Sequence, residues 1–177
     1  GTMLVYAFII ACMFFAAGIS WKLIAFAGGA AVVGVPILWF KIMEPYQQNR
    51  ILALIFPDNP EYKSILVQQN AGKVSIGSGQ LFGKGFLKGT QNQFGFLPTK
   101  HTDFIFSVIA EELGFIGALL AILLLFLIIA RCIKASQEAN DSFGKFLCLG
   151  IAAMLIFHTF ENIGMCIGLM PVTGIPL

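Results

Sequence analysis

Four long apolar stretches dominate this sequence and restrict what the chain can fold into. They cover residues 3–19, 23–40, 104–130 and 146–170. Each is close to the roughly 20 residues that a helix needs to cross the hydrocarbon core of a bilayer. The chain is 58% hydrophobic and 11% charged, whereas soluble domains carry about 25% charged residues. We therefore expect an all-α integral membrane protein with four transmembrane helices.

A polar stretch, residues 41–102, separates the second span from the third and is too long to be a plain connection. Its segment 46–56 is amphipathic, too short to cross a bilayer, and ends at Pro57. Segment 61–76 is a second candidate helix, which ends at the glycines that follow it. We expect a large structured loop that contains short amphipathic helices at the membrane surface.

The charges of the short connections predict the orientation. Residues 20–22 and 131–145 lie on one side of the membrane, because two spans separate them. Basic residues in short loops favour the cytoplasm, whereas long loops are largely exempt from this rule. The short connections are therefore expected in the cytoplasm and the long loop outside. Their basic residues are Lys22, Arg131, Lys134 and Lys145.

Several classes of function find no support in the sequence. A net charge of +2 without a basic face does not favour nucleic acid. Gly83-Lys84 is no nucleotide-binding P-loop, since Gly85 follows the lysine where Ser or Thr is required. The four cysteines are far apart and lack the spacing of a zinc site. We expect no organic cofactor, and membrane lipids as the surroundings.

The polar loop contains a glycine-rich segment at 77–89. Its glycines let the backbone approach a ligand closely, and Lys84 and Lys88 would suit a diphosphate. A flexible re-entrant turn explains the same pattern equally well.

Asp103 stands at the start of the third apolar stretch. An ionisable group at membrane depth is a functional candidate, and this carboxylate could act as a general base toward a sugar hydroxyl. The alternative is a helix N-cap. Glu111 lies within roughly 80° of Asp103 on a helix surface, so the two could border one cavity. Structural partners for Glu111, Glu112 and Glu161, such as Lys100, His158 or Asn162, are equally compatible with the sequence.

Long motifs resemble the SEDS family of bacterial wall synthesis, which includes RodA, FtsW and SpoVE. They are IGSGQLFGKG within 71–114, GTQ at Gly89–Gln91, FLPTKHTDFIF at Phe96–Phe106, AEELGFIG at Ala110–Gly117 and NIGMCIGLMPVTGIPL at Asn162–Leu177. The tracts GISWKL and ILWFKIMEPYQQNRIL fit the RodA branch better. The resemblance implies ten helices in the whole protein, of which this chain would cover the sixth to ninth. We therefore expect a fragment that is inactive alone.

The resemblance also implies an activity, a peptidoglycan glycosyltransferase that polymerises lipid II in cell elongation. Asp103, in the HTDFIF motif, would be the catalytic general base, and undecaprenyl diphosphate would leave. Thr99-Lys100 departs from the family's acidic residue before the HTD triplet, so an acidic partner there is in doubt. Candidate substrate-binding residues are Lys84, Lys88, Thr90, Gln91, His101, Thr102 and Glu112.

Further expectations concern location, cofactor and partner. The resemblance implies a multi-pass protein of the bacterial inner membrane and a class B penicillin-binding protein as partner. A divalent cation, magnesium or manganese, is a possible cofactor with Asp103 as a possible ligand. Two other classes of function remain open. One is a transporter of the lipid-linked precursor, with His158, Glu161 and Asn162 along its path, and the other is a scaffold for the transpeptidase.

Overall fold

The computed structural model describes residues 2–20, 22, 29–30, 32, 34, 36–89, 103–175 and 177. Within these ranges all regular secondary structure is helical, which agrees with the predicted all-α class. The elements in chain order are α1 (Thr2–Ala16), the π-helix η1 (Leu38–Ile42), α3 (Pro45–Ile55), the 3-10 helix η2 (Pro60–Tyr62), α4 (Lys63–Ser78), α6 (Ile105–Glu138) and α7 (Ser142–Ile167).

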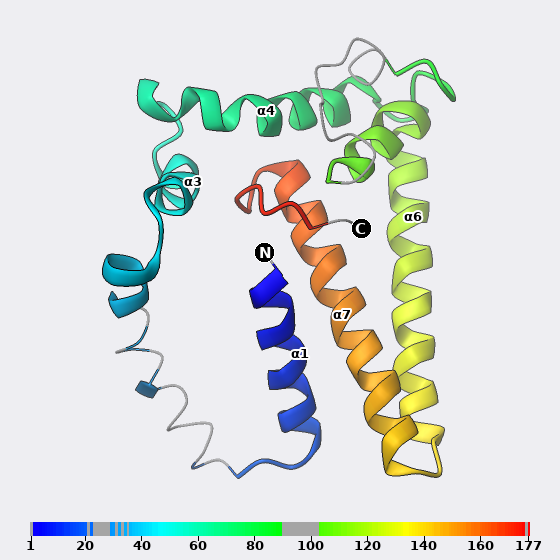
Figure 1. Ribbon diagram of the computed structural model, residues 1–177. Helices are drawn as coiled ribbons and strands as arrows, with labels where there is room; N and C mark the ends of the chain where they lie inside the picture. The colour runs from blue at the N-terminus through cyan, green and yellow to red at the C-terminus, as the bar shows by residue number, and fades with distance from the viewer. Residues whose placement is uncertain are drawn as a thin grey trace.

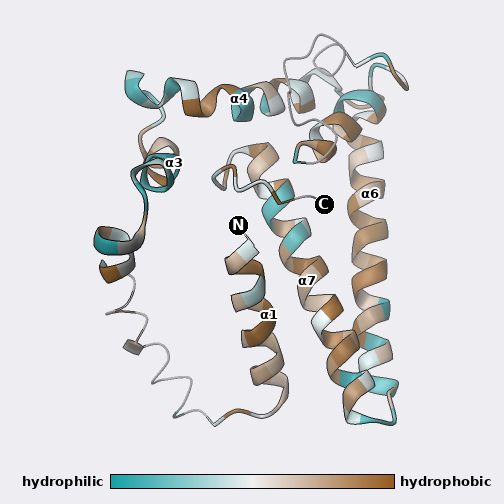
Figure 2. Ribbon diagram, viewed as in Figure 1, coloured by the Kyte–Doolittle hydropathy of each residue, from teal (hydrophilic) through white to brown (hydrophobic). Residues whose placement is uncertain are grey.

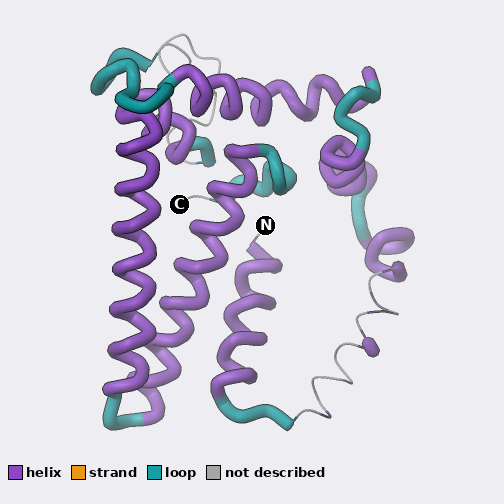
Figure 3. The backbone as a smooth tube through the Cα atoms, turned by 180° about the vertical axis from the view of Figure 1, so that it is seen from behind, coloured by secondary structure: helices purple, strands orange, loops and turns teal. Residues whose placement is uncertain are grey.

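Three helices stand side by side, and a fourth lies across their ends. Helix α7 packs against both α1 and α6, and α4 runs across the ends of α6 and α7 (Figure 1). Seen from behind, α3 lies beside the end of α4 that is distant from α6 (Figure 3). Residues 79–89, the described part of the polar segment that follows α4, therefore lie at one end of the pair formed by α6 and α7.

Helices α6 and α7 have the length and the surface of membrane spans. They contain 34 and 26 residues, and only 17% and 11% of their most apolar windows are buried within the chain. Their apolar middle sections contrast with polar residues at the connecting turn (Figure 2). Such exposed apolar surface is unfavourable in water and suits lipid. The third and fourth predicted spans are thus membrane-length helices.

The other two predicted spans are not established. Helix α1 has 15 residues, fewer than a full crossing needs. It ends before residue 19, because Gly18 takes a left-handed φ of +77°. The span predicted at 23–40 lies largely outside the described residues, and its last described part is the π-helix η1.

The boundaries predicted for the last two spans need correction. Helix α6 continues beyond residue 130 to Glu138, so Arg131 and Lys134 lie in a helix and not in a linker. The cause is that residues 131–138 contain no helix breaker, although they are polar. Helix α7 begins at Ser142, where Asp141 accepts a hydrogen bond from the Gly144 amide at 2.7 Å.

Helix α7 also ends earlier than predicted. The expected end was residue 170, before Pro171, but the helix stops at Ile167. Gly168 takes φ +83°, the left-handed conformation that commonly closes helices, and the Leu169 amide bonds to the Gly164 carbonyl at 2.8 Å. The chain can therefore turn back toward the start of α6.

Local capping signals explain the two helices in the polar loop. Pro45 opens α3, and Glu44 and Gln47 form a reciprocal capping box. The Asn59 side chain accepts from the Glu61 amide at 3.1 Å and starts η2, which leads into α4. Helices α3 and α4 occupy most of the segments 46–56 and 61–76, where short helices were expected.

Candidate active site at the start of α6

Asp103 lies directly before α6 and is half-buried. The cap position of this helix belongs to Phe104, whose carbonyl accepts from the Val108 amide at 3.2 Å. Among the described residues no side chain caps this helix end, so the alternative role of Asp103 as N-cap does not apply. The Phe104 ring is fully buried beside Gly72 of α4, where a Cβ would come within 3.0 Å of it. The residue after Asp103 is thus fixed by packing.

The main chain of Asp103 is held from α7. Asn162 is fully buried, and its side-chain amide donates to the Asp103 carbonyl at 2.9 Å and to the Ile175 carbonyl at 3.0 Å. The Cys166 thiol, one turn further on, also faces the Asp103 carbonyl at 3.9 Å. One α7 side chain therefore joins the start of α6 to the segment after α7.

The segment after α7, residues 168–175, passes beside the Asp103 carboxylate and is tied down by side chains of α3 and α4. A Cβ on Gly174, which has φ +75°, would lie 3.8 Å from Asp103 Oδ2. Gln69 of α4 donates to the Met170 carbonyl at 2.7 Å, and Arg50 of α3 donates to the Val172 carbonyl at 2.5 Å. These bonds place the segment as one wall next to Asp103.

A second polar cluster lies further along α6. The Glu111 carboxylate is fully buried, 2.8 Å from the Lys84 ammonium and 2.9 Å from the Ser75 hydroxyl. Glu112, also buried, accepts a hydrogen bond from the Leu87 amide at 3.1 Å. Gly89 lies against both acids, since a Cβ there would come within 3.0 Å of Glu111 Oε2. The glycine-rich segment therefore wraps around two buried carboxylates.

The same segment enters the hydrogen-bond ladder of α6. Helix α6 is broken at Gly114, which has φ 71° and ψ −168°. The backbone groups on either side of the break bond to residues 80–85 instead of to one another. A Cβ on Gly83 or Gly114 would overlap the opposite backbone, so this approach requires glycine. The four bonds join Lys84 N to Glu111 O (3.0 Å), Gly85 N to Glu112 O (3.0 Å), Phe115 N to Gln80 O (2.8 Å) and Ile116 N to Leu81 O (3.3 Å).

The predicted site residues fall into four groups. Asp103 stands by itself at the start of α6, whereas Lys84 and Glu112 belong to the second cluster. Lys88 is exposed. Thr90, Gln91, His101 and Thr102 lie outside the described residues.

Of the partners that the sequence offered for the predicted acids, Lys100 lies outside the described residues. Glu111 pairs with Lys84, which was not among the three partners considered for it. Asn162 bonds to main-chain carbonyls. Glu161 of α7 is 3% exposed, and its Oε2 has no hydrogen-bond partner among the described residues.

Three polar side chains that organise the site were missed. Arg50, Gln69 and Ser75 were not predicted to have any role, yet each bonds to the segment after α7 or to Glu111. A signal existed for two of them. The buried residues of α4 recur at every third position, at Leu66, Gln69, Gly72 and Ser75. A polar residue on such a buried face needs a partner.

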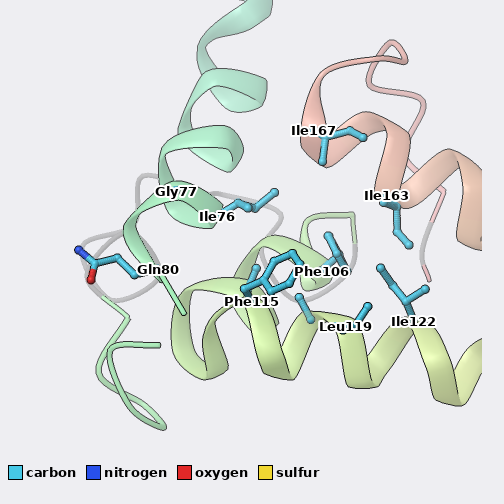
Figure 4. A pocket seen from close by; sticks show the side chains of 11 residues that line it. Ile76, Gly77, Gln80, Phe106, Phe115, Leu119, Ile122, Ile163 and Ile167 are labelled. Atoms are coloured by element: carbon cyan, nitrogen blue, oxygen red, sulfur yellow. The ribbon is translucent and has the colours of Figure 1, made fainter. Parts of the chain in front are cut away.

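Two apolar cavities flank the α6–α7 pair. One, of about 420 Å³, lies between the end of α4 and both helices, and Phe106, Phe115, Leu119 and Ile163 point into it while the Gln80 amide points away (Figure 4). The other, of about 540 Å³, lies further along the pair. The two share the lining residues Ile122, Ile163 and Ile167. Neither Asp103 nor Glu111 lines either of these two cavities.

A third cavity, of about 460 Å³, is more polar and belongs to the loop itself. It is formed by the seven consecutive residues 78–84, which include Lys84. It adjoins the first apolar cavity at Gln80. Among the described residues, no three His, Cys, Asp or Glu side chains come together in a way that could hold a metal ion.

Comparison with known proteins covers the whole chain. The chain is 42% identical over 178 residues to peptidoglycan glycosyltransferase MrdB of Escherichia coli K12, matching all of this chain and 48% of that protein. It is 35% identical over 157 residues to peptidoglycan glycosyltransferase RodA of Treponema pallidum, matching 88% of this chain and 34% of that protein. The chain thus spans about half the length, or less, of these curated relatives.

A solved structure agrees with these sequence matches. It comes from work on structural coordination of polymerization and crosslinking by a peptidoglycan synthase complex. It superposes with a TM-score of 0.73 at 28% identity, over 100% of this chain and 48% of that one. The model of the family described as cell cycle protein, FtsW/RodA/SpoVE, matches residues 1–177. The chain therefore belongs to the FtsW/RodA/SpoVE family of cell cycle proteins.

Proposed function

We propose that the intact protein is a peptidoglycan glycosyltransferase that polymerises lipid II during cell elongation. Two relatives that match most or all of this chain carry that enzyme name. The observation that carries the proposal is the position of Asp103. Its half-buried carboxylate lies where the helix pair meets the polar segment, on a main chain held by Asn162. A base in this position can reach a sugar at the membrane surface while the lipid chain stays in the bilayer.

In the proposed reaction Asp103 accepts the proton of the acceptor sugar's 4-hydroxyl group. The oxygen attacks the anomeric carbon of the donor, and the bond from that carbon to the diphosphate breaks. Undecaprenyl diphosphate leaves with the bonding electron pair. The products are a glycan longer by one disaccharide, the lipid diphosphate and a protonated Asp103.

The glycine-rich segment is proposed to receive the leaving diphosphate. Lys88 is exposed, whereas the Lys84 ammonium is already 2.8 Å from Glu111. We therefore assign Lys88 to the diphosphate and Lys84 to holding the segment against α6. Thr90 and Gln91 follow Lys88 closely in the chain, and His101 and Thr102 precede Asp103. We propose substrate-binding roles for these four residues on the motif alone.

A divalent cation fits this arrangement only with help from the substrate. Of the described candidates, Asp103 could supply one ligand, and Glu112 is already bonded to the Leu87 amide. Magnesium usually takes one or two carboxylates together with substrate phosphates. Such an ion would offset the charge of the leaving diphosphate.

We propose that the protein is multi-pass in the bacterial inner membrane, with the segment 41–102 on the outer face. The solved structure that it resembles comes from work on a complex for polymerization and crosslinking. By that likeness we propose a class B penicillin-binding protein as partner. Residues 1–177 alone are expected to be inactive, since relatives are about twice as long.

The test is Asp103→Asn in the intact protein, with purified lipid II and detection of glycan strands. The variant should fold and bind its partner but lose polymerisation by at least about a hundredfold, the range typical for removing a general base. Asp58→Asn, an exposed acid between α3 and η2, is the matched control and should polymerise normally.

Two other outcomes would reject the enzyme proposal. Movement of labelled lipid II across liposomes without strand formation would indicate a transporter. No strands from either the wild type or Asp103→Asn, with the transpeptidase still recruited, would indicate a scaffold.

A further inference from the structure

Asn162 has a contact pattern that differs from that of a lipid-facing or pore-lining residue. It is fully buried, and its side-chain nitrogen donates to two carbonyls, those of Asp103 and Ile175. These acceptors are 59 residues before it and 13 residues after it in the chain. Its carbonyl oxygen lies 3.9 Å from the Cys166 thiol, so the polar atoms of the amide face protein on every side.

Asp103 depends on this amide because α6 does not include it. The helical hydrogen bonds begin with the Phe104 carbonyl, one residue later. The Asp103 carbonyl is therefore outside the ladder. Its partners among the described residues, Asn162 and the weakly bonding Cys166, both come from α7. The second Asn162 bond holds Ile175, the neighbour of Gly174, whose Cβ position is 3.8 Å from Asp103 Oδ2.

We propose that Asn162 is a positioning residue for the transfer reaction, holding the Asp103 main chain against residues 174–175 so that the carboxylate keeps one orientation. This inference rests on the proposed function and extends it to a residue that would not touch the substrate. Displacing a catalytic group by about 1 Å can cost about a hundredfold in rate. Without the amide, the half-buried Asp103 carbonyl and the buried Ile175 carbonyl lose this donor, and the segments they belong to can separate.

The experiment measures kcat and KM for lipid II with the intact protein carrying Asn162→Asp. Aspartate has the shape of asparagine but cannot donate to the two carbonyls when ionised. We expect kcat to fall by about 10- to 100-fold, with KM changed by less than about threefold, because the substrate contacts are untouched. Asn162→Ala removes the amide without adding a charge. It should likewise lower kcat while leaving KM nearly unchanged.

Ser136→Ala is the matched control. The Ser136 hydroxyl is buried on α6 and donates to the Lys145 carbonyl of α7 at 2.8 Å, at the opposite end of the same helix pair. Its loss removes one comparable bond between the same helices, so it reports the effect of weaker helix contact alone. It should leave kcat within about twofold, since kcat of the folded enzyme reflects the geometry of the reacting groups.

The outcomes distinguish a wrong role for Asn162 from a wrong role for Asp103. If folded Asn162→Asp and Asn162→Ala turn over at the wild-type kcat while Asp103→Asn is inactive, the positioning role is wrong and the proposed function stands. If Asp103→Asn is fully active, the general-base role that the proposed function gives to Asp103 is wrong, and the positioning role of Asn162 is wrong with it. If neither Asn162 variant accumulates, Gly174→Ala replaces them, because its new Cβ would lie beside Asp103 Oδ2. A normal kcat for that variant overturns the inference, and a kcat lowered at least about fivefold with unchanged KM supports it.

Discussion

The Lys84 ammonium lies 2.8 Å from the Glu111 carboxylate, and the two side chains differ sharply in exposure, at 28% for Lys84 and 0% for Glu111. The partners come from different parts of the chain, the glycine-rich segment and α6. Their pairing requires that segment to be docked on the helix at the Gly114 break. The buried Glu111 carboxylate is therefore neutralised only when the loop is docked on α6.

This asymmetry predicts unequal costs for removing either partner. Lys84→Met takes the cation from a fully buried carboxylate, and breaking a buried pair in this way costs about 3–5 kcal/mol. Glu111→Gln leaves a partly exposed ammonium that water can reach and keeps a group that can bond to Ser75, so we expect a loss nearer about 1–2 kcal/mol. Thermal unfolding of the intact protein in detergent measures both. Equal losses would contradict this assignment.

The exposed pair Lys134–Glu138 provides the control for that comparison. Its atoms are 3.6 Å apart, and both side chains are more than half exposed. Lys134→Met should therefore change stability by less than about 0.5 kcal/mol.

Gly114→Ala is expected to disrupt the junction between the loop and α6. The residue adopts φ 71° and ψ −168°, a region occupied almost only by glycine, and a Cβ would overlap the backbone of Gly83 and Leu81. Strain and overlap together should cost at least about 3 kcal/mol. Chemical or thermal denaturation measures the loss.

Gly77→Ala serves as the control for the glycine prediction. Gly77 lies in α4, and a Cβ there would meet nothing within 4 Å. The substitution should be neutral or stabilise by up to about 1 kcal/mol, since alanine favours helix. If both variants lost a similar, large amount of stability, backbone strain and overlap at Gly114 would not be the cause of the loss in Gly114→Ala.

Gln69→Leu should release the segment that follows α7. The Gln69 amide, 1% exposed, donates to the carbonyls of Met165 and Met170 at 3.3 and 2.7 Å. Its loss leaves the buried Met165 carbonyl and the half-buried Met170 carbonyl without this donor, at a cost of about 1–3 kcal/mol. Hydrogen exchange of the amides at 168–175 should become faster. The exposed neighbour Asn70, changed to Ala, should leave their exchange unaltered.

Asp141→Ala tests the start of α7. The Asp141 carboxylate accepts from the Gly144 amide at 2.7 Å and supplies the N-cap. Replacement should cost about 0.5–2 kcal/mol and fray the first turn of α7 without changing activity, because the site is at the other end of the helix. Exchange of the amides at 142–146 measures the fraying. Unchanged protection of those amides would contradict the capping role.

The sequence was informative about helices and much less so about their ends. Hydropathy located α6 and α7, since runs of apolar residues long enough to cross a bilayer are seldom anything else. It did not show that Arg131 and Lys134 continue α6, because polar residues without a breaker are equally compatible with a helix or a linker. It also did not show the break at Gly114, since glycine is common within membrane helices.

The sequence by itself determined the helical class, the membrane-length helices α6 and α7, the family and the candidate role of Asp103, because these depend on local composition and on contiguous motifs. The tertiary structure decided which distant groups meet. It set Lys84 against Glu111, Asn162 against the carbonyls of Asp103 and Ile175, and residues 80–85 in the ladder of α6. The physical reason is that a buried polar group must find a partner wherever folding brings one, and a linear sequence does not specify which partner that is.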